Sequence, residues 1–180
     1  MEMQGERRIK ASRDIVWRAL NTTDVLKACI PGCETLEQTS ATTFEGTVNQ
    51  KVGPVKARFK CGVELTDIVD AESYTITGEG KGGAAGFVKG GAKVRLKDED
   101  EVTVLTYDAE AKVGGKIAQL GGRIIDGYAR KMADEFFDRF KQAVEPPEVE
   151  PPEVEPPPEA KVAEAAGEAK KKGWFRRLFG

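Results

Sequence analysis

The chain has 180 residues, a net charge of -2 at neutral pH and no histidine. The absence of histidine excludes Ser-His-Asp triads, histidine-containing zinc sites and acid–base catalysis by imidazole. The three cysteines, Cys29, Cys33 and Cys61, are an odd number with no secretory signal before them, which predicts a reducing cytosol.

Charge and proline are unevenly distributed along the chain. Residues 1–144 contain 22 basic and 22 acidic residues, whereas residues 145–159 contain six glutamates and no base. Seven of the nine prolines lie between Pro146 and Pro158, and residues 160–180 contain six bases against two glutamates. We therefore predict a folded domain over 1–144, an extended Pro/Glu-rich linker over 145–159 and a basic tail over 160–180. Because the body is neutral, nucleic-acid binding is not expected.

The first 32 residues predict one strand and two short helices before the main sheet. Met3, Gly5 and Ile9 alternate with polar neighbours, as in a strand. Ser12 is a suitable N-cap for a helix from Arg13 to about Asn21. The same apolar spacing continues to Ile30, where Pro31-Gly32 ends a second short helix.

From Cys33 to Val113 the apolar residues recur with a period of two, which is typical of antiparallel strands with one wet face. The clearest run places Val55, Ala57, Phe59, Cys61, Val63 and Leu65 on one side. Another places Leu105, Tyr107, Ala109, Ala111 and Val113 on one side. From about Gly115 to Val144 the spacing changes to three and four, which predicts one long amphipathic helix. These patterns predict a two-layer α+β domain in which the sheet curls around that helix.

Four segments carry a resemblance to a known family. They are Ile-Pro-Gly-Cys at Ile30–Cys33, Val-Gly-Pro-Val at Val52–Val55, the glycine-rich stretch Gly78–Gly91, and Gly-Gly-Lys-Ile-Ala-Gln-Leu-Gly at Gly114–Gly121. On these residues the chain resembles the CoxG family, named for the G subunit of carbon monoxide dehydrogenase, within the helix-grip (START/Bet v 1-like, SRPBCC) superfamily. The resemblance extends over about residues 3–143.

This resemblance implies a curved antiparallel sheet wrapped around a long C-terminal helix, with a hydrophobic ligand held between them. It also implies a non-catalytic accessory that recruits a CO dehydrogenase-type molybdenum hydroxylase to the cytoplasmic membrane, where electrons from that enzyme enter the respiratory chain. It does not identify the ligand of this chain.

Small residues at inward positions favour a pocket inside the domain. Gly46, Gly78, Gly90 and Ala92 stand where a filled core would have valine or leucine, leaving either close helix–sheet packing or space. Nearby aromatic residues would suit a flat apolar ligand such as a respiratory quinone. We expect the following residues to line that pocket: Trp17, Leu20, Ile30, Phe44, Val48, Phe59, Cys61, Tyr74, Ile76, Val88, Ala92, Tyr107, Leu120, Gly121, Ile124 and Tyr128.

Other interpretations of the same segments remain open. The run Gly78–Gly83 lies between strands with no helix after it, which disfavours a phosphate loop. The cysteines lack metal-site spacing, so neither a metal nor a covalent cofactor is expected. One alternative is a membrane tether with a solid core; another is a polyketide cyclase or aromatase-like enzyme, with Gln50, Tyr107 and Lys116 as candidate acid–base groups.

The C-terminal tail has the composition of an interfacial membrane helix. Its apolar and basic residues are Lys170, Lys171, Lys172, Trp174, Phe175, Arg176, Arg177, Leu178 and Phe179. Bulky apolar side chains beside bases predict docking on anionic lipid at the inner face of the cell membrane. The fifteen-residue linker in polyproline II geometry would reach about 45 Å at ~3.1 Å per residue.

Overall fold

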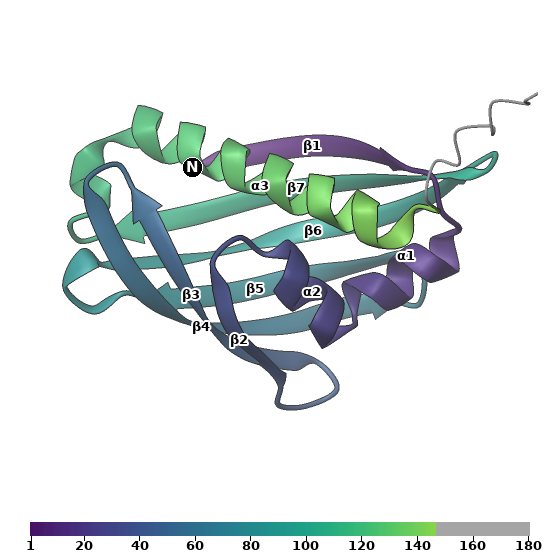
Figure 1. Ribbon diagram of the computed structural model, residues 1–180, viewed down its shortest axis with the longest axis horizontal. Coiled ribbons are helices and arrows are strands. Elements are labelled where there is room, and N and C mark those ends of the chain that lie inside the picture. The colour runs from purple at the N-terminus through teal and green to yellow at the C-terminus, as the bar shows by residue number, and fades with distance from the viewer. Residues whose placement is uncertain (147–180) are drawn as a thin grey trace, which may run out of the picture. The chain divides into compact units, whose positions relative to one another are not determined.

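One antiparallel sheet of seven strands forms the body of the domain in the computed structural model, which describes residues 1–146 (Figure 1). Consecutive strands from β2 to β7 are neighbours, and β1 pairs with β7 at the other edge. The strands are β1 (Glu2–Ile9), β2 (Cys33–Gln38), β3 (Thr43–Val52), β4 (Val55–Val69), β5 (Ser73–Lys81), β6 (Phe87–Glu99) and β7 (Val102–Gly114).

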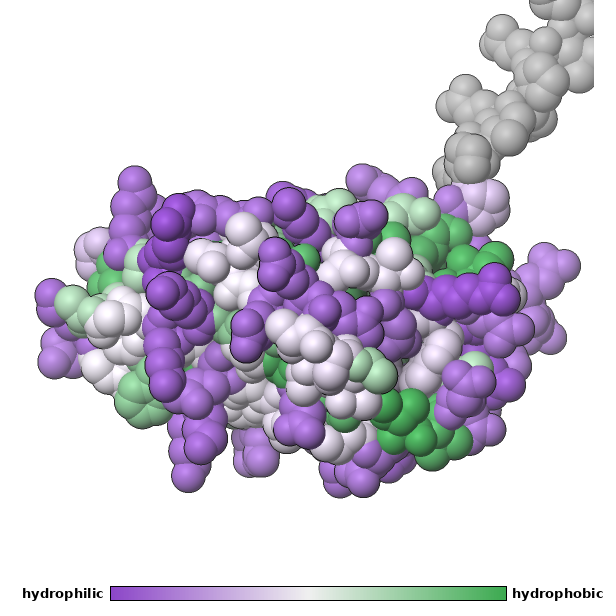
Figure 2. Space-filling model, turned by 90° about the horizontal axis from the view of Figure 1, so that it is seen from below, coloured by the Kyte–Doolittle hydropathy of each residue, from purple (hydrophilic) through white to green (hydrophobic). Residues whose placement is uncertain are grey.

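Helices cover one face of this sheet. The short helices α1 (Arg13–Leu20) and α2 (Thr23–Cys29) connect β1 to β2, and the long helix α3 (Gly122–Val144) lies over the sheet, roughly along β1 and β7 (Figure 1). The predicted two-layer α+β fold, a curved sheet around a long C-terminal helix, is therefore confirmed. Seen from below, the surface is largely hydrophilic with smaller hydrophobic areas, consistent with apolar residues gathered inside (Figure 2).

The long helix begins later than the sequence pattern predicted. Gly115 and Gly121 have φ values of +80° and +88°, a backbone conformation outside the α-helical region. Between them, Ala118–Leu120 form a single 3-10 turn, and α3 starts at Gly122. The prediction of one helix from about Gly115 was wrong because these two glycines interrupt it.

Two apolar clusters lie between the sheet and the helices. The larger one contains fully buried Ile9, Val16, Leu105 and Phe140. The smaller one is built on Phe59, Ala85 and Ile117. Helix α3 packs on both, because Phe137 and Phe140 belong to the larger cluster and Ile125 packs against the smaller.

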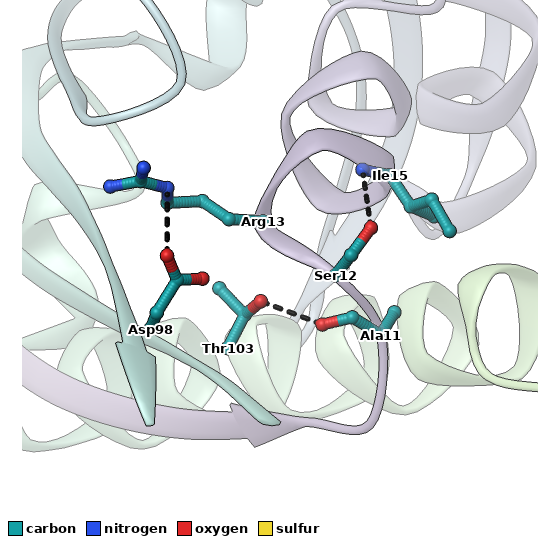
Figure 3. Close-up of polar contacts among 6 residues, drawn as sticks. All are labelled: Ala11, Ser12, Arg13, Ile15, Asp98 and Thr103. Carbon is teal, nitrogen blue, oxygen red and sulfur yellow. Dashed lines mark hydrogen bonds and ion pairs between the residues drawn. The ribbon is translucent and has the colours of Figure 1, made fainter. Parts of the chain in front are cut away.

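Polar contacts fix the start of α1 against the β6–β7 hairpin (Figure 3). The Ser12 hydroxyl accepts a hydrogen bond from the Ile15 amide at 3.3 Å, as predicted for an N-cap. The fully buried Thr103 donates its hydroxyl to the Ala11 carbonyl at 2.7 Å, and Arg13 Nε lies 3.4 Å from the Asp98 carboxylate. These contacts hold the segment between β1 and α1 against the β6–β7 hairpin, next to the larger apolar cluster.

Candidate functional site

A cavity of about 510 Å³ lies between the sheet and α3. Strands β2 to β7 contribute residues of the wall, and α3 contributes Ile125, Tyr128, Ala129 and Met132. The lining is almost wholly apolar. The volume is within the range of about 300–1,000 Å³ that is usual for small-molecule sites.

The cavity exists because one band of the sheet lacks large inward side chains. Strand register places Gly78 opposite Gly90, Gly90 opposite Ala111, and Ala92 opposite Ala109. All of these residues line the cavity, as does Gly46 on β3. On one side of this band the inward residues Tyr74, Val94 and Leu105 belong to the larger cluster, and on the other side Phe59 and Ile117 belong to the smaller one.

Close backbone packing and open space occur together in this band. A Cβ atom at Gly90 would lie 2.1 Å from the Glu110 carbonyl oxygen, so the backbone of β6 approaches β7 too closely for a side chain there. A Cβ at Gly80 would instead meet only side chains, at 3.3 Å from Cys61 Sγ. The glycines therefore both bring the strands together and leave the space beneath α3.

Half of the predicted pocket residues line the cavity. These eight are Ile30, Val48, Phe59, Cys61, Ile76, Val88, Ala92 and Tyr128. The other eight, which do not line it, are Trp17, Leu20, Phe44, Tyr74, Tyr107, Leu120, Gly121 and Ile124.

Most of the second group lie in the packed core. Trp17 meets Tyr74 edge-on with ring centres 5.3 Å apart, and Tyr107 stacks on Phe137 at 5.5 Å. Leu20 and Phe44 are buried in the larger cluster. Leu120 and Gly121 belong to the turn before α3, and Ile124 is 47% exposed to solvent. Alternation identified the inward face correctly, and the small residues Gly46, Gly78, Gly90 and Ala92 marked part of the cavity, but the large inward residues of the packed core could not be told from those of the cavity wall.

Several lining residues were missing from the prediction although their pattern was visible. Ala109, Ala111 and Val113 stand on the predicted inward face of β7, and Ile125 and Ala129 on the apolar face of the helix. Met1 and Cys33 also line the cavity. The alternation of apolar residues along β7 could have identified Ala109, Ala111 and Val113 as lining residues. Nothing in the sequence places Met1 beside the cavity.

One polar network lies in the cavity wall. The Tyr128 hydroxyl donates to Gln50 Oε1, and Gln50 Nε2 donates to the Pro31 carbonyl at 2.7 Å. Burial raises the pKa of Tyr128, so its hydroxyl remains a donor at neutral pH. The turn at Pro31-Gly32 packs tightly on β3, because a Cβ on Gly32 would lie 2.1 Å from the Asn49 carbonyl oxygen. The Ile-Pro-Gly-Cys segment thus connects α2 to this network.

The two cavity cysteines are protonated thiols at neutral pH. Cys33 and Cys61 are free, and burial raises the pKa of both. The nucleophilic form of cysteine is the thiolate, so burial lowers their reactivity.

The candidate acid–base groups do not gather in one place. Gln50 lines the cavity, Tyr107 stacks on Phe137, and Lys116 is exposed.

The predicted membrane-docking residues Lys170–Phe179 and nearly all of the linker lie outside the described residues. Helix α3 ends at Val144, and its C-cap Glu145 accepts a hydrogen bond from the Lys10 amide at 3.0 Å. Within residues 1–146, no helix has the length and apolar character needed to cross a membrane.

Comparisons with known proteins place this architecture among characterised folds. A family model described as CoxG, the G subunit of carbon monoxide dehydrogenase, matches residues 5–145. A conserved protein from Geobacillus kaustophilus is 30% identical with a TM-score of 0.76, over 80% of this chain and 95% of its own. No curated protein sequence matches the chain.

More distant solved structures share the fold alone. TTHA0849 from Thermus thermophilus is 16% identical, with a TM-score of 0.61 over 80% of this chain and 97% of its own. Ara h 8.0201 is 14% identical, with a TM-score of 0.58 over the same shares of the two chains. These neighbours are Bet v 1-like helix-grip proteins, which agrees with the sheet and helix described above.

Proposed function

The chain belongs to the CoxG family and has the helix-grip fold, and from this premise we propose that it is a non-catalytic accessory of a CO dehydrogenase-type molybdenum enzyme. In this proposal the domain carries a lipophilic molecule in its cavity, and the tail recruits the enzyme to the inner face of the cell membrane. The carried molecule would link the enzyme to the respiratory chain. The observation that supports this role best is the apolar cavity beneath α3.

The chemistry of the cavity suits a quinone. A quinone has a flat apolar ring with carbonyl groups, and the cavity combines apolar walls with the Tyr128–Gln50 network on one side. Quinones react with thiolates, and the raised pKa values of Cys33 and Cys61 keep these groups protonated. A cavity with these two thiols is therefore compatible with an electrophilic ligand.

Mass spectrometry of an organic extract tests the carrier role. The full chain is purified from its native host without detergent, and a lipophilic molecule is expected at close to one equivalent per chain. The control is a protein of similar size purified in parallel, which should contribute only background lipid. An empty extract from the full chain would contradict ligand carriage and favour a tether that acts through its surface alone.

Membrane recruitment is assigned to the aromatic and basic tail. Removal of Trp174–Gly180 is expected to abolish most co-sedimentation with vesicles of phosphatidylcholine and phosphatidylserine, because the apolar anchor and two arginines are lost. Substitution of Glu164 and Glu168 by glutamine is a matched control, since it alters the tail without touching its aromatic residues. Equal sedimentation of the intact and shortened chains would remove the tail from the proposal.

A further inference from the structure

Three pairs of lysines face each other directly across neighbouring strands of the sheet. Strand register places Lys51 opposite Lys56, Lys60 opposite Lys81, and Lys89 opposite Lys112. All six are exposed, on the face of the sheet turned away from the cavity. Like charges directly opposite each other destabilise a sheet. Folding alone gives no reason to keep three such pairs in a domain with equal numbers of acids and bases.

All three pairs lie at one end of the sheet, here called the loop end. Connections in an antiparallel meander alternate between ends, so the β3–β4 turn, the β5–β6 connection and the β7–α3 connection share this end (Figure 1). Lys116 and Arg123 add positive charge in the last of these connections and at the start of α3.

The opposite end of the sheet carries more acidic groups, two of which, Asp98 and Glu99, are paired with Arg13 and Arg8. Its β4–β5 turn contains Asp70 and Glu72, and its β6–β7 turn lies between Asp98 and Glu101. The zero net charge of residues 1–144 therefore conceals a separation of charge along the strands. The residue counts in the sequence analysis had shown a surplus of positive charge only in the tail, because they summed all charges of the domain together.

The loop end has fewer acidic groups than lysines: Glu79 lies on β5, and Glu2 and Glu110 lie beside Lys89 and Lys112. Within residues 1–146, the only lysine of the three pairs with an ion pair is Lys81, whose Nζ lies 3.9 Å from the Glu79 carboxylate. Both side chains of that pair are largely exposed, at 73% and 45%, so the attraction is weak. Glu79 also stands opposite Lys89 in the register, so one carboxylate is shared between two of the three lysine pairs. The loop end therefore keeps a surplus of positive charge.

An exposed aromatic ring lies among these lysines. Phe87 is 44% exposed and stands opposite both Lys81 and Gly114. Its ring covers Gly114, where a Cβ atom would lie 2.3 Å from a ring carbon. Ile124, 47% exposed, adds an apolar side chain in the first turn of α3. Exposed apolar groups surrounded by lysines are typical of surfaces that enter the headgroup region of a bilayer.

We propose that the loop end is a second membrane-contact surface, carried by the domain itself and recognising anionic lipid. This inference goes beyond tail docking and does not depend on it. The smaller cluster of Phe59, Ala85 and Ile117 closes the cavity region toward this end. A bilayer held there would therefore lie against the end of the cavity that Phe59 and Ile117 line.

Charge reversal of one lysine in each pair tests this surface in the full chain. The triple variant Lys56→Glu, Lys60→Glu and Lys112→Glu turns each repulsive pair into an attractive one and keeps the Lys81–Glu79 ion pair. Thermal stability is therefore expected to stay equal or rise. Affinity for phosphatidylserine-containing vesicles is expected to fall more than about tenfold, since each base near an anionic surface contributes roughly 1 kcal/mol, or about fivefold. Opposite changes in stability and binding cannot arise from misfolding.

The control variant Lys27→Glu, Lys93→Glu and Lys97→Glu changes the net charge equally at exposed positions outside the three pairs. It is expected to retain most vesicle binding. Phe87→Ser should weaken binding without a change in charge, and pure phosphatidylcholine vesicles should not distinguish the variants. An equal loss of vesicle binding in both triple variants would mean that only the net charge of the chain matters, and it would overturn the proposal. Unchanged vesicle binding of the loop-end triple variant would also overturn the proposal and would indicate that these lysines meet an acidic protein partner. If removal of the tail still abolished vesicle binding in that case, docking through the tail would stand by itself.

Discussion

Replacement of Ala129 by phenylalanine is expected to empty the cavity of ligand while leaving the domain folded. Ala129 lies on the face of α3 that lines the cavity, so a ring at this position would enter the space between helix and sheet. Affinity for a lipophilic ligand should fall by more than about tenfold, which corresponds to ~1.4 kcal/mol. Stability should remain equal or increase by about 1 kcal/mol, because filling a cavity buries apolar surface. The measurement is ligand content by mass spectrometry, with displacement of an apolar fluorescent probe.

The neighbouring substitution Arg130→Phe provides a matched control. Arg130 is exposed on the same helix and is not part of the cavity lining, so it adds the same ring outside the site. Ligand content of this variant should equal that of the unsubstituted chain. If Ala129→Phe also retained its full ligand content, the cavity beneath α3 would not be the binding site.

Substitution of Phe140 by alanine should produce the largest loss of stability in the domain. Phe140 is 0% exposed and stacks on Phe136 with ring centres 5.8 Å apart, joining the last turns of α3 to the larger cluster. Removal of a buried phenyl ring costs about 3–5 kcal/mol. A domain of this size has a free energy of unfolding of only about 5–15 kcal/mol. Denaturant titration should therefore show a much earlier midpoint with an unchanged slope.

Ile124→Ala is the control for this effect, because Ile124 stands on the same helix with 47% of its surface exposed. Its cost should be within about 0.5 kcal/mol. Phe140 does not line the cavity, so the Phe140→Ala variant should still bind ligand under conditions where it is folded. A loss smaller than about 1 kcal/mol for Phe140→Ala would mean that α3 is held mainly by other contacts.

Local patterns in the sequence determined which elements form and which side of each faces inward. The alternation of Val55 to Leu65 identified a strand with one apolar face, and the spacing from Ile125 to Phe140 identified the long helix. Such periods depend only on residues a few positions apart. The start of α3 was missed because the positive φ of Gly121 belongs to the folded turn, where a pattern of apolar residues gives no sign of it.

The small inward residues Gly46, Gly78, Gly90 and Ala92 indicated a cavity, but only the tertiary structure decided its extent and where the charge of the sheet gathers. Gly78, Gly90 and Ala111 form one band only because the register of β5, β6 and β7 aligns them. Register likewise brings together Lys60 and Lys81, which are far apart in the chain. Composition and periodicity describe each strand by itself, whereas a cavity and a charged surface depend on how residues of different strands are aligned.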